Sequence, residues 1–306
     1  MSSGNMGWTC VAAAQAFAWF LVLPPLLKPH WEQMWARFSP LTSQLILAEI
    51  SFFYFLLYSL VMLPIYYGNF PFFEQYKISD KPWAWRSEKK EVRDNFCALS
   101  FRSLNLFSFN FFVLIPLLVT GKYYVMGDNM SFATKDWPPL PTLLLHNIAL
   151  TLVHEFFFYW CHRLAHHPKL YRFHKVHHEY KQNTVLAAQH EHPIDYVVTI
   201  ATPVLLAVSL LQPHSITLFI WTAWLVIANL DDHVGYEFPW SPVRWFWLAA
   251  RTDMHEFHHS KNMGCFASKL SVNDTLFKSE APYLLWRTKQ EGAFSARVGK
   301  AKGKAA

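Results

Sequence analysis

Residues 162–178 read HRLAHHPKLYRFHKVHH and directly follow an apolar segment, Leu140–Cys161. The histidines of this stretch are spaced by three and four residues, and residues at that spacing share one face of an α-helix. An apolar segment of about 20 residues is long enough to cross a bilayer as a helix. The stretch therefore predicts a membrane-spanning helix whose end presents several imidazoles in one direction.

The composition agrees with a membrane protein. Of the 306 residues, 53% are hydrophobic, 18% aromatic and only 16% charged, whereas soluble domains carry about 25% charged residues. The net charge of +6 is distributed loop by loop and forms no stripe, so we expect no nucleic-acid partner. The four cysteines include no CxxC pair, so we expect neither a cysteine zinc site nor a disulfide framework.

Three further segments have the length and apolar character of membrane helices. The four predicted spans are Trp8–Leu27, Leu41–Tyr67, Cys97–Thr120 and Leu140–Cys161. We interpret the first as a retained helix, because no cleavage site follows it. Two shorter runs, Tyr196–Leu211 and Ser215–Leu230, predict a hairpin that either crosses poorly or dips in and returns, with both ends on one side.

Lysine and arginine counts predict the topology. Segments 66–96, 162–193 and 231–306 contain six, five and eleven, against two each in 28–40 and 121–139. The positive-inside rule places the three basic segments and the N-terminus in the cytosol. We therefore predict an all-α, polytopic membrane protein with a cytosolic histidine-rich di-metal cap. Its expected parts are an N-terminal membrane region (1–139), a catalytic domain (140–280) and a basic tail (281–306).

Three motifs supply the candidate ligands: HxxxH at 162–166 and HxxHH at 174–178 and 255–259. Their histidines are His162, His166, His174, His177, His178, His255, His258 and His259. His192 and His233, which flank the hairpin, are two further candidates. Ten imidazoles exceed the four ligands of one zinc ion and suit two metals. Imidazole binds Zn, Cu, Fe and Ni, so the spacing leaves the metal open.

A single HxxHH motif is also compatible with a solvated helix face, whereas three motifs on one predicted side favour metal binding. We assign His190 and His167 to packing or support. Several acidic residues beside the motifs are candidates to orient ligand rings: Glu179, Glu191, Asp231, Asp232, Asp253 and Glu256. The pair His154-Glu155, near the end of a span, predicts either a substrate or supporting role or interfacial solvation.

Over residues 140–275 the chain resembles the fatty acid hydroxylase/sterol desaturase superfamily of membrane di-iron oxygenases. The stretches HKVHHEY (174–180), AQHEHP (188–193), GYEFPWSP (235–242) and GCFAS (264–268) are most similar to its 4-methylsterol oxidase (methylsterol monooxygenase) branch. Asp231-Asp232-His233 also resembles the sphingoid-base hydroxylase branch. The chain departs from the sterol branch at Asn273-Asp274, where that branch has Trp-Asp, and at 277–279, which read Phe-Lys-Ser for Phe-Gly-Thr. The departures leave the substrate open.

The resemblance implies an oxidoreductase of the monooxygenase class with two iron ions on the motif histidines, which zinc can replace in purified samples. O2 would be the co-substrate. Because the chain has no GxGxxG fingerprint, electrons from NAD(P)H would arrive through a b-type cytochrome or reductase docked on the basic face. The implied substrate is a membrane lipid, most simply the 4-methyl group of a sterol precursor. The alternatives are hydroxylation or desaturation of a sphingoid base, a fatty acyl chain or another sterol position.

A metal transporter is the alternative from a different functional class. Transporters place polar ligands near the middle of the membrane, whereas these motifs follow the ends of the apolar segments. The chemistry of the implied lipid favours a multi-pass protein of the endoplasmic reticulum membrane. Lys302 and Lys304 resemble a KxKxx retrieval signal on a cytosolic C-terminus.

Overall fold

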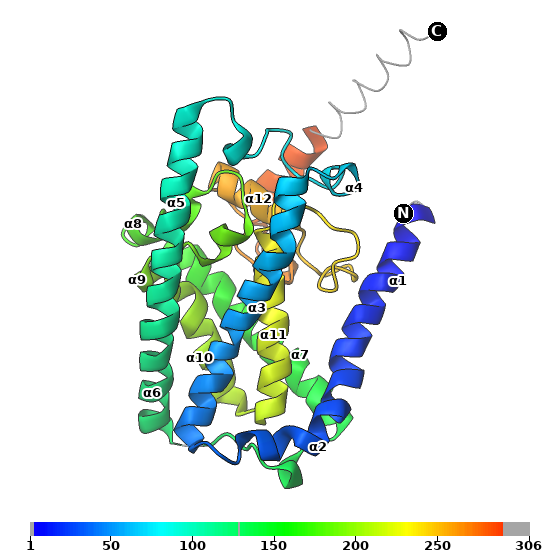
Figure 1. The fold of residues 1–306 in the computed structure, drawn as a ribbon, viewed down its shortest axis with the longest axis vertical. Helices are drawn as coiled ribbons and strands as arrows, with labels where there is room; N and C mark the ends of the chain where they lie inside the picture. Colours follow the sequence, from blue (N-terminus) through cyan, green and yellow to red (C-terminus); the bar gives the residue numbers. More distant parts are fainter. Residues whose placement is uncertain (1–2, 128, 290–306) are drawn as a thin grey trace.

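The computed structural model describes residues 3–127 and 129–289, and within these ranges its helices and turns form no strand. The helices make an elongated bundle (Figure 1). Five of the described helices are long and apolar enough to cross a membrane, namely Met6–Trp35, Pro40–Gly68, Lys90–Met126, Leu140–Ala165 and Pro193–Leu211. The all-α, polytopic prediction is confirmed, and each of the four predicted spans lies within one of these helices.

The first span is longer than the sequence indicated and bends at its end. It comprises α1 (Ser3–Phe17), a π-helical turn (Ala18–Val22) and α2 (Leu23–Trp35). Figure 1 shows α1 running along one side of the molecule and α2 turning across the lower end. Two prolines begin α2 and a third, Pro29, lies inside it; proline removes a helical hydrogen bond and bends the axis.

Two long helical segments, α3 and the third span, pack against one another through α3 and α6. Helix α3 (Pro40–Gly68) begins with the hydroxyl of Ser39 accepting the Thr42 N–H and ends at Asn69 in the left-handed region. The third span joins α5 (Lys90–Phe109), a π-helical turn (Asn110–Leu114) and α6 (Ile115–Met126). It is longer than the predicted Cys97–Thr120 at both ends. At its start, charged helical turns precede the apolar part, and at its end the helix continues to Met126.

Helix α7 (Leu140–Ala165) packs against the predicted hairpin. The arms of the hairpin are α10 (Thr202–Leu211), which continues a π-helical turn (Tyr196–Ala201), and α11 (Ser215–Asp232). Both arms pack on α7, and α11 also packs on α3. The arms turn at the lower end of the bundle (Figure 1), so their other ends lie together in the upper half.

Short helices and turns gather in that upper half. They are α4 (Pro71–Glu74), α8 (Tyr171–His174), α9 (Pro193–Asp195), α12 (Thr252–Lys261) and α13 (Val272–Leu276), with 3-10 turns at Ala84–Arg86, His177–Glu179 and Val185–Gln189; a further 3-10 turn, Thr134–Asp136, precedes α7. Figure 1 shows α4, α5, α8, α9, α12 and the N-terminus on this side. The described parts of the three basic segments therefore share one end of the molecule.

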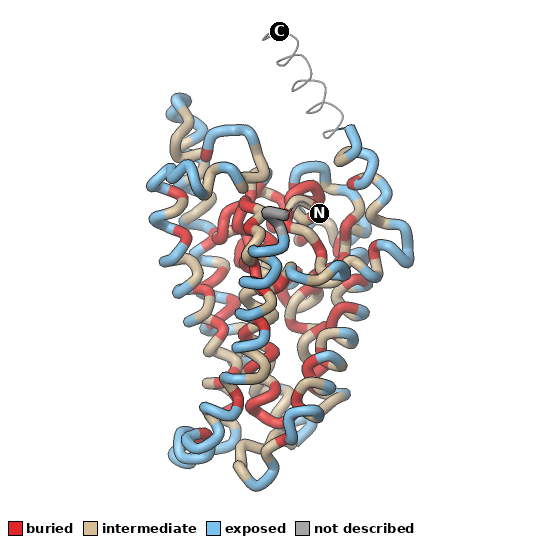
Figure 2. Tube along the Cα trace, turned by 90° about the vertical axis from the view of Figure 1, so that its right-hand side faces the viewer, coloured by how far each residue is buried: buried red, intermediate tan, exposed pale blue. Residues whose placement is uncertain are grey.

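Burial follows the arrangement expected in a bilayer. Buried segments run through the interior, and the outer turns are exposed (Figure 2). Large apolar side chains on the outer faces are exposed, among them Phe53, Leu57, Leu117, Leu145 and Ile148. So large an exposed apolar surface is explained by contact with lipid.

The beginning of the basic tail is folded. Residues 281–289 are helical, and Tyr283 is buried against Phe257 and Trp286. The KxKxx pattern at Lys302 and Lys304 lies outside the described residues.

Candidate metal centre

The three motifs reach one place from different elements. His162 lies in the last turn of α7 and His166 caps its end. His174 ends α8, and His177 and His178 follow in a 3-10 turn. His255, His258 and His259 lie on α12, and His233 caps the C-terminus of α11.

These nine histidines form two groups, and within each group the ligand nitrogens lie within 4.8 Å of one another. The first group is His162, His166, His174, His178 and His258, and the second is His177, His233, His255 and His259. Each HxxHH motif contributes to both groups. Its first and last histidines, four residues apart, point together, and the middle one points to the other group.

The spacing of the nitrogens fits ligands around a shared ion. In the first group Nε2 of His258 lies 3.0 Å from that of His162 and 3.2 Å from that of His166. In the second group Nε2 of His255 lies 2.9 Å from that of His233 and 3.1 Å from that of His259. Metal–imidazole bonds of about 2.0–2.1 Å place neighbouring ligand nitrogens about 2.9–3.4 Å apart.

Backbone carbonyls orient two rings of the first group. Nδ1 of His162 donates to the Phe266 carbonyl at 3.0 Å, and Nδ1 of His258 donates to the Gly264 carbonyl at 2.6 Å. The loop needs glycine, since Gly264 has φ +62° and a Cβ there would lie 2.2 Å from the Ser279 carbonyl oxygen. Protonation at Nδ1 leaves the Nε2 lone pair facing the group, as metal binding requires.

Two further rings are fixed in the same way. Nδ1 of His174 donates to the buried carboxylate of Asp195 at 2.9 Å, and Nδ1 of His233 donates to the Asn229 carbonyl at 2.7 Å. Sequence reasoning missed Asp195. Its only signal is an acidic residue three positions after His192, and nothing in the spacing connects it to His174.

The protein environment keeps seven of these imidazoles neutral. Burial, then neighbouring imidazoles, holds the pKa of His177, His178, His255, His258 and His259 well below the ordinary 6.5. Burial lowers the pKa of His166 to about 3 and that of His233 to about 4. A neutral imidazole is the form that binds metal. The donor set, its spacing and its protonation therefore fit two metal ions.

His192 is the predicted ligand that the structure does not bring to either group. Its Nδ1 accepts the Ile194 N–H at 3.2 Å and so caps α9, and its ring packs on Phe173. The cap occupies the Nδ1 lone pair, so that nitrogen does not serve as a metal ligand. His167 is exposed, as expected for a residue outside the centre.

The acidic residues expected to orient ligand rings have other partners. Glu256 accepts the Asn183 N–H, and Glu179 accepts from Arg102 and from His190. Asp231 and Asp232 both pair with the buried Arg244, and Asp232 also pairs with Lys269 at 3.0 Å; Asp253 pairs with Arg251. Glu191 lies nearest a ligand, with Oε1 3.9 Å from Nδ1 of His177.

The pair His154-Glu155 is buried, which excludes interfacial solvation. Glu155 accepts the Lys269 and Leu270 N–H groups at 3.0 Å. It thereby anchors the segment that follows the Gly264 loop. His154 lines a cavity below the centre.

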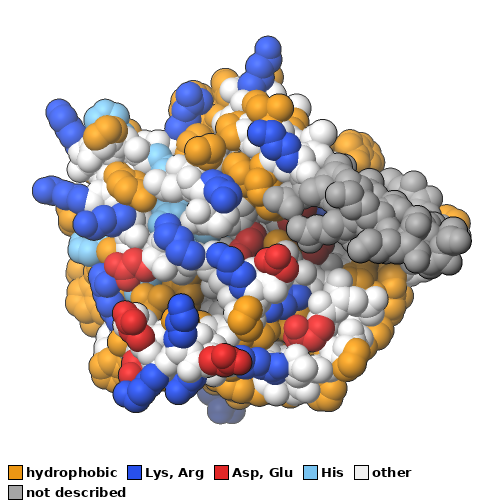
Figure 3. All heavy atoms as spheres, turned by 90° about the horizontal axis from the view of Figure 1, so that it is seen from above, with side chains coloured by type: hydrophobic (Ala, Val, Ile, Leu, Met, Phe, Trp, Pro, Cys, Tyr) orange, Lys and Arg blue, Asp and Glu red, His pale blue; other side chains and the backbone are white. Residues whose placement is uncertain are grey.

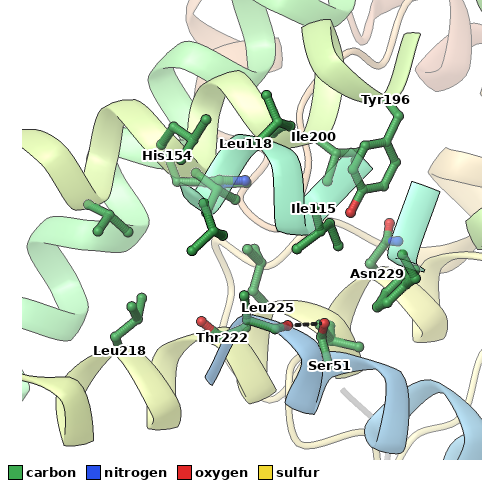
Figure 4. A pocket seen from close by; sticks show the side chains of 18 of the residues that line it. Ser51, Ile115, Leu118, His154, Tyr196, Ile200, Leu218, Thr222, Leu225 and Asn229 are labelled. Carbon is green, nitrogen blue, oxygen red and sulfur yellow. Dashed lines mark hydrogen bonds between the residues drawn. The ribbon is translucent and has the colours of Figure 1, made fainter. Parts of the chain in front are cut away.

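That cavity is apolar, with a volume of about 190 Å³, and lies between α3, α6, α7, α10 and α11. Figure 4 shows Ile115, Leu118, Ile200, Leu218 and Leu225 around it. A chamber of about 20 Å³ lies beside it and is lined by five of the clustered histidines: His162, His174, His177, His233 and His255. Cavity and chamber share Phe158, Glu191, Ile200, Asn229, Ser268 and Lys269, so the apolar space leads to the candidate metal centre.

The end of the molecule nearest the centre carries mixed charge. Seen from this end, Lys and Arg side chains are spread over the surface, and Asp and Glu side chains lie among them (Figure 3).

Comparison with known proteins gives matches over the part of the chain that contains the site. Residues 147–279, which contain all nine clustered histidines, match the family model described as fatty acid hydroxylase. The chain is 26% identical to methylsterol monooxygenase 1 of Gallus gallus over 282 residues, 89% of each chain. It is 28% identical to methylsterol monooxygenase 1 of Rattus norvegicus over 77% of each chain. It is also 29% identical to the very-long-chain aldehyde decarbonylase GL1-11 of Oryza sativa subsp. indica, over 71% of this chain and 78% of that one. No solved structure gives a significant match.

Proposed function

We propose that this protein is a membrane di-iron oxygenase that uses O2 to oxidise the 4-methyl group of a sterol precursor, because residues 147–279 match the family model described as fatty acid hydroxylase. The observation that carries the proposal is the apolar cavity between membrane helices that leads to the nine clustered histidines, seven of which are buried and two half-buried. The methylsterol monooxygenases to which the chain is similar favour a sterol among membrane lipids.

The metal ligands are proposed to be the nine clustered histidines. Iron bound there would supply the activation of O2 that attack on an unactivated C–H bond requires. The chain itself contributes the fixed orientation of the rings, through Asp195 and the carbonyls of Asn229, Gly264 and Phe266. Burial of the histidines excludes bulk water from the centre.

The cavity positions the lipid. Its apolar walls take up the body of the substrate, and its junction with the chamber directs one end toward the histidines. Because the cavity lies between helices that contact lipid, we propose that the substrate enters sideways from the bilayer. The clustered histidines lie at or beyond the ends of the long helices, as His162 and His233 do. A metal transporter would instead place its ligands near the middle of the membrane.

A second candidate is the oxidation of another lipid, such as a fatty acyl chain, a sphingoid base or a long-chain aldehyde. The similarity to the rice very-long-chain aldehyde decarbonylase supports a long-chain aldehyde as the alternative substrate. An apolar cavity accepts an extended chain as well as a ring system, so substrate competition distinguishes the two.

We place the centre on the cytosolic side of the endoplasmic reticulum membrane. The described parts of the basic segments share one end of the bundle, which the positive-inside rule assigns to the cytosol. A b-type cytochrome or a reductase, drawing on NAD(P)H, would deliver electrons at this end, where lysines and arginines are spread over the surface.

The experiment is an assay in membranes that contain the protein, with a 4-methylsterol, NAD(P)H and 18O2. The proposal predicts a hydroxymethyl or carboxyl product that carries 18O, and none with His258→Ala. Oxidation of a long-chain aldehyde, acyl chain or sphingoid base with no sterol product would replace the sterol by that lipid. Labelled product from the His258→Ala protein would contradict the ligand assignment.

A further inference from the structure

Two polar atoms at the junction of cavity and chamber have no hydrogen-bond partner among the described residues. They are Oε2 of Glu191 and Oγ of Ser268. Glu191 is 4% exposed and Ser268 is 5% exposed. Both residues line the cavity and the chamber, so the two atoms belong to side chains beside the space that a substrate would occupy.

Both residues sit on backbone that is held in place. Nδ2 of Asn110 donates to the Glu191 carbonyl at 3.0 Å. The segment around Ser268 is anchored on both sides, because Asp274 accepts the Ala267 N–H at 2.8 Å and Glu155 accepts the Lys269 N–H at 3.0 Å. The two side chains are therefore fixed features of the junction.

A buried polar atom without a partner is unfavourable, and an apolar lipid tail cannot relieve it. A hydroxyl group can, because it donates to a carboxyl oxygen and accepts from a serine hydroxyl. Asn229 also lines both the cavity and the chamber, and Figure 4 shows its side chain beside Tyr196. Its amide makes only a long contact of 3.4 Å with the Ala188 carbonyl. The rest of the lining named above is largely apolar.

We propose that Glu191 and Ser268 bind a free hydroxyl group of the lipid substrate. Binding there places the carbon next to the hydroxyl-bearing carbon, with the methyl group that it carries, at the metal centre. Oε1 of Glu191 is 3.9 Å from His177, so a hydroxyl bound there lies beside the second histidine group. In a 4-methylsterol the 3-hydroxyl is on the carbon adjacent to the one that bears the methyl group. The inference rests on the proposed function and adds a requirement to it: the hydroxyl must be free, and its ethers and esters are poor ligands.

The test is equilibrium binding to the purified full-length protein in nanodiscs. The two probes are a 4-methylsterol with a free 3-hydroxyl and the same sterol as its 3-methyl ether. Wild type should bind the free hydroxyl about tenfold or more tightly than the ether. Ser268→Ala and Glu191→Leu should each weaken binding of the free sterol severalfold and leave binding of the ether unchanged.

Conservative variants and a matched control separate recognition from structure. Ser268→Thr and Glu191→Gln keep hydrogen-bonding atoms and should keep the preference. Ser59→Ala removes another buried hydroxyl without a partner, on α3 and outside the cavity lining, and should also keep it. Metal content and the thermal unfolding midpoint, measured for each variant, show whether it is folded. If Glu191→Leu does not fold, Ser268→Ala carries the test.

Equal loss of both probes, or an unchanged preference in Ser268→Ala, would overturn the inference. If wild type oxidises the sterol but binds hydroxyl and ether equally, the hydroxyl site fails and the proposed function stands. If wild type binds neither sterol and instead binds a long-chain aldehyde, the proposed function fails and this inference fails with it.

Discussion

At the scale of single residues, the centre depends on which nitrogen of each ring is protonated. His174 donates from Nδ1 to Asp195, which leaves its Nε2 3.1 Å from Nε2 of His178. His192 uses its Nδ1 lone pair on the Ile194 N–H instead. Sequence spacing could identify the histidines of the motifs, but it could not separate His233 from His192, since both lie beside the hairpin. Only the fold decides which of these rings turns inward.

Replacement of His258 should lower the metal content of the protein, whereas replacement of His192 should not. His258→Ala removes a nitrogen that lies 3.0 Å from His162 and 3.2 Å from His166, so we expect the purified protein to lose at least one of two bound metal ions. His192→Ala is the matched control. It should keep its metal and lose about 1 kcal/mol of stability with the helix cap. Metal analysis by mass spectrometry measures both, and equal loss in the two variants would contradict the assignment.

The lowered pKa values predict an acid-sensitive metal-free protein. The folded pKa of His166 is about 3 and that of His233 about 4, whereas unfolded histidine titrates near 6.5. Below about pH 6.5 the unfolded chain therefore binds more protons than the folded chain, and stability falls as the pH falls. Each such histidine contributes up to about 1.4 kcal/mol per pH unit.

Thermal unfolding of the metal-free protein between pH 7.5 and 5.5 tests this. The midpoint should fall with pH, and it should fall less steeply when His177 and His259 are both replaced by glutamine. A midpoint independent of pH over this range would show that the imidazoles are not held neutral by the fold.

At the scale of elements, the helical repeat explains why the motifs were recognisable. Residues four apart meet in His255 and His259 on α12 as they do in His174 and His178. The spans were also predictable from apolar length, but their ends were not. Helix α5 starts at Lys90, seven residues before the predicted apolar span begins at Cys97. Its first turn is charged and contains an exposed ion pair between Lys90 and Asp94, so apolar length could not indicate this start.

The loop at Gly264 orients a ligand ring through its carbonyl, a role that the GCFAS pattern in the sequence did not predict. Gly264→Ala forces a side chain into a left-handed conformation and against the Ser279 carbonyl. We expect a loss of roughly 1–3 kcal/mol in stability and weaker metal retention, because the loop carbonyl orients His258. Gly121→Ala, where a Cβ meets nothing within 4 Å, should leave both unchanged. Chemical denaturation with metal analysis compares the two, and equal behaviour would refute the role of the loop.

At the scale of the whole molecule, charge distribution and fold give one topology. The N-terminus and the described parts of the basic segments lie at the end that carries the histidines, and the connection from α6 to α7 lies at the other (Figure 1). The counts of Lys and Arg could predict this sidedness, but not the cavity, because its walls come from five helices distant in sequence.

Protease protection in sealed microsomes tests the topology. Epitope tags at the N-terminus and the C-terminus should be removed by external protease, and a tag inserted between α6 and α7 should be protected until detergent is added. Protection of both terminal tags, with cleavage of the inserted one, would invert the predicted orientation.

The proposed oxidation of a sterol 4-methyl group at the histidine centre is tested most directly by the lipid profile of cells that lack the gene. Mass spectrometry should show accumulation of 4-methyl or 4,4-dimethyl sterols, reversed by the wild-type protein and not by His258→Ala. Normal 4-methylsterols together with missing hydroxylated sphingoid bases, or with another unprocessed lipid, would contradict the sterol assignment.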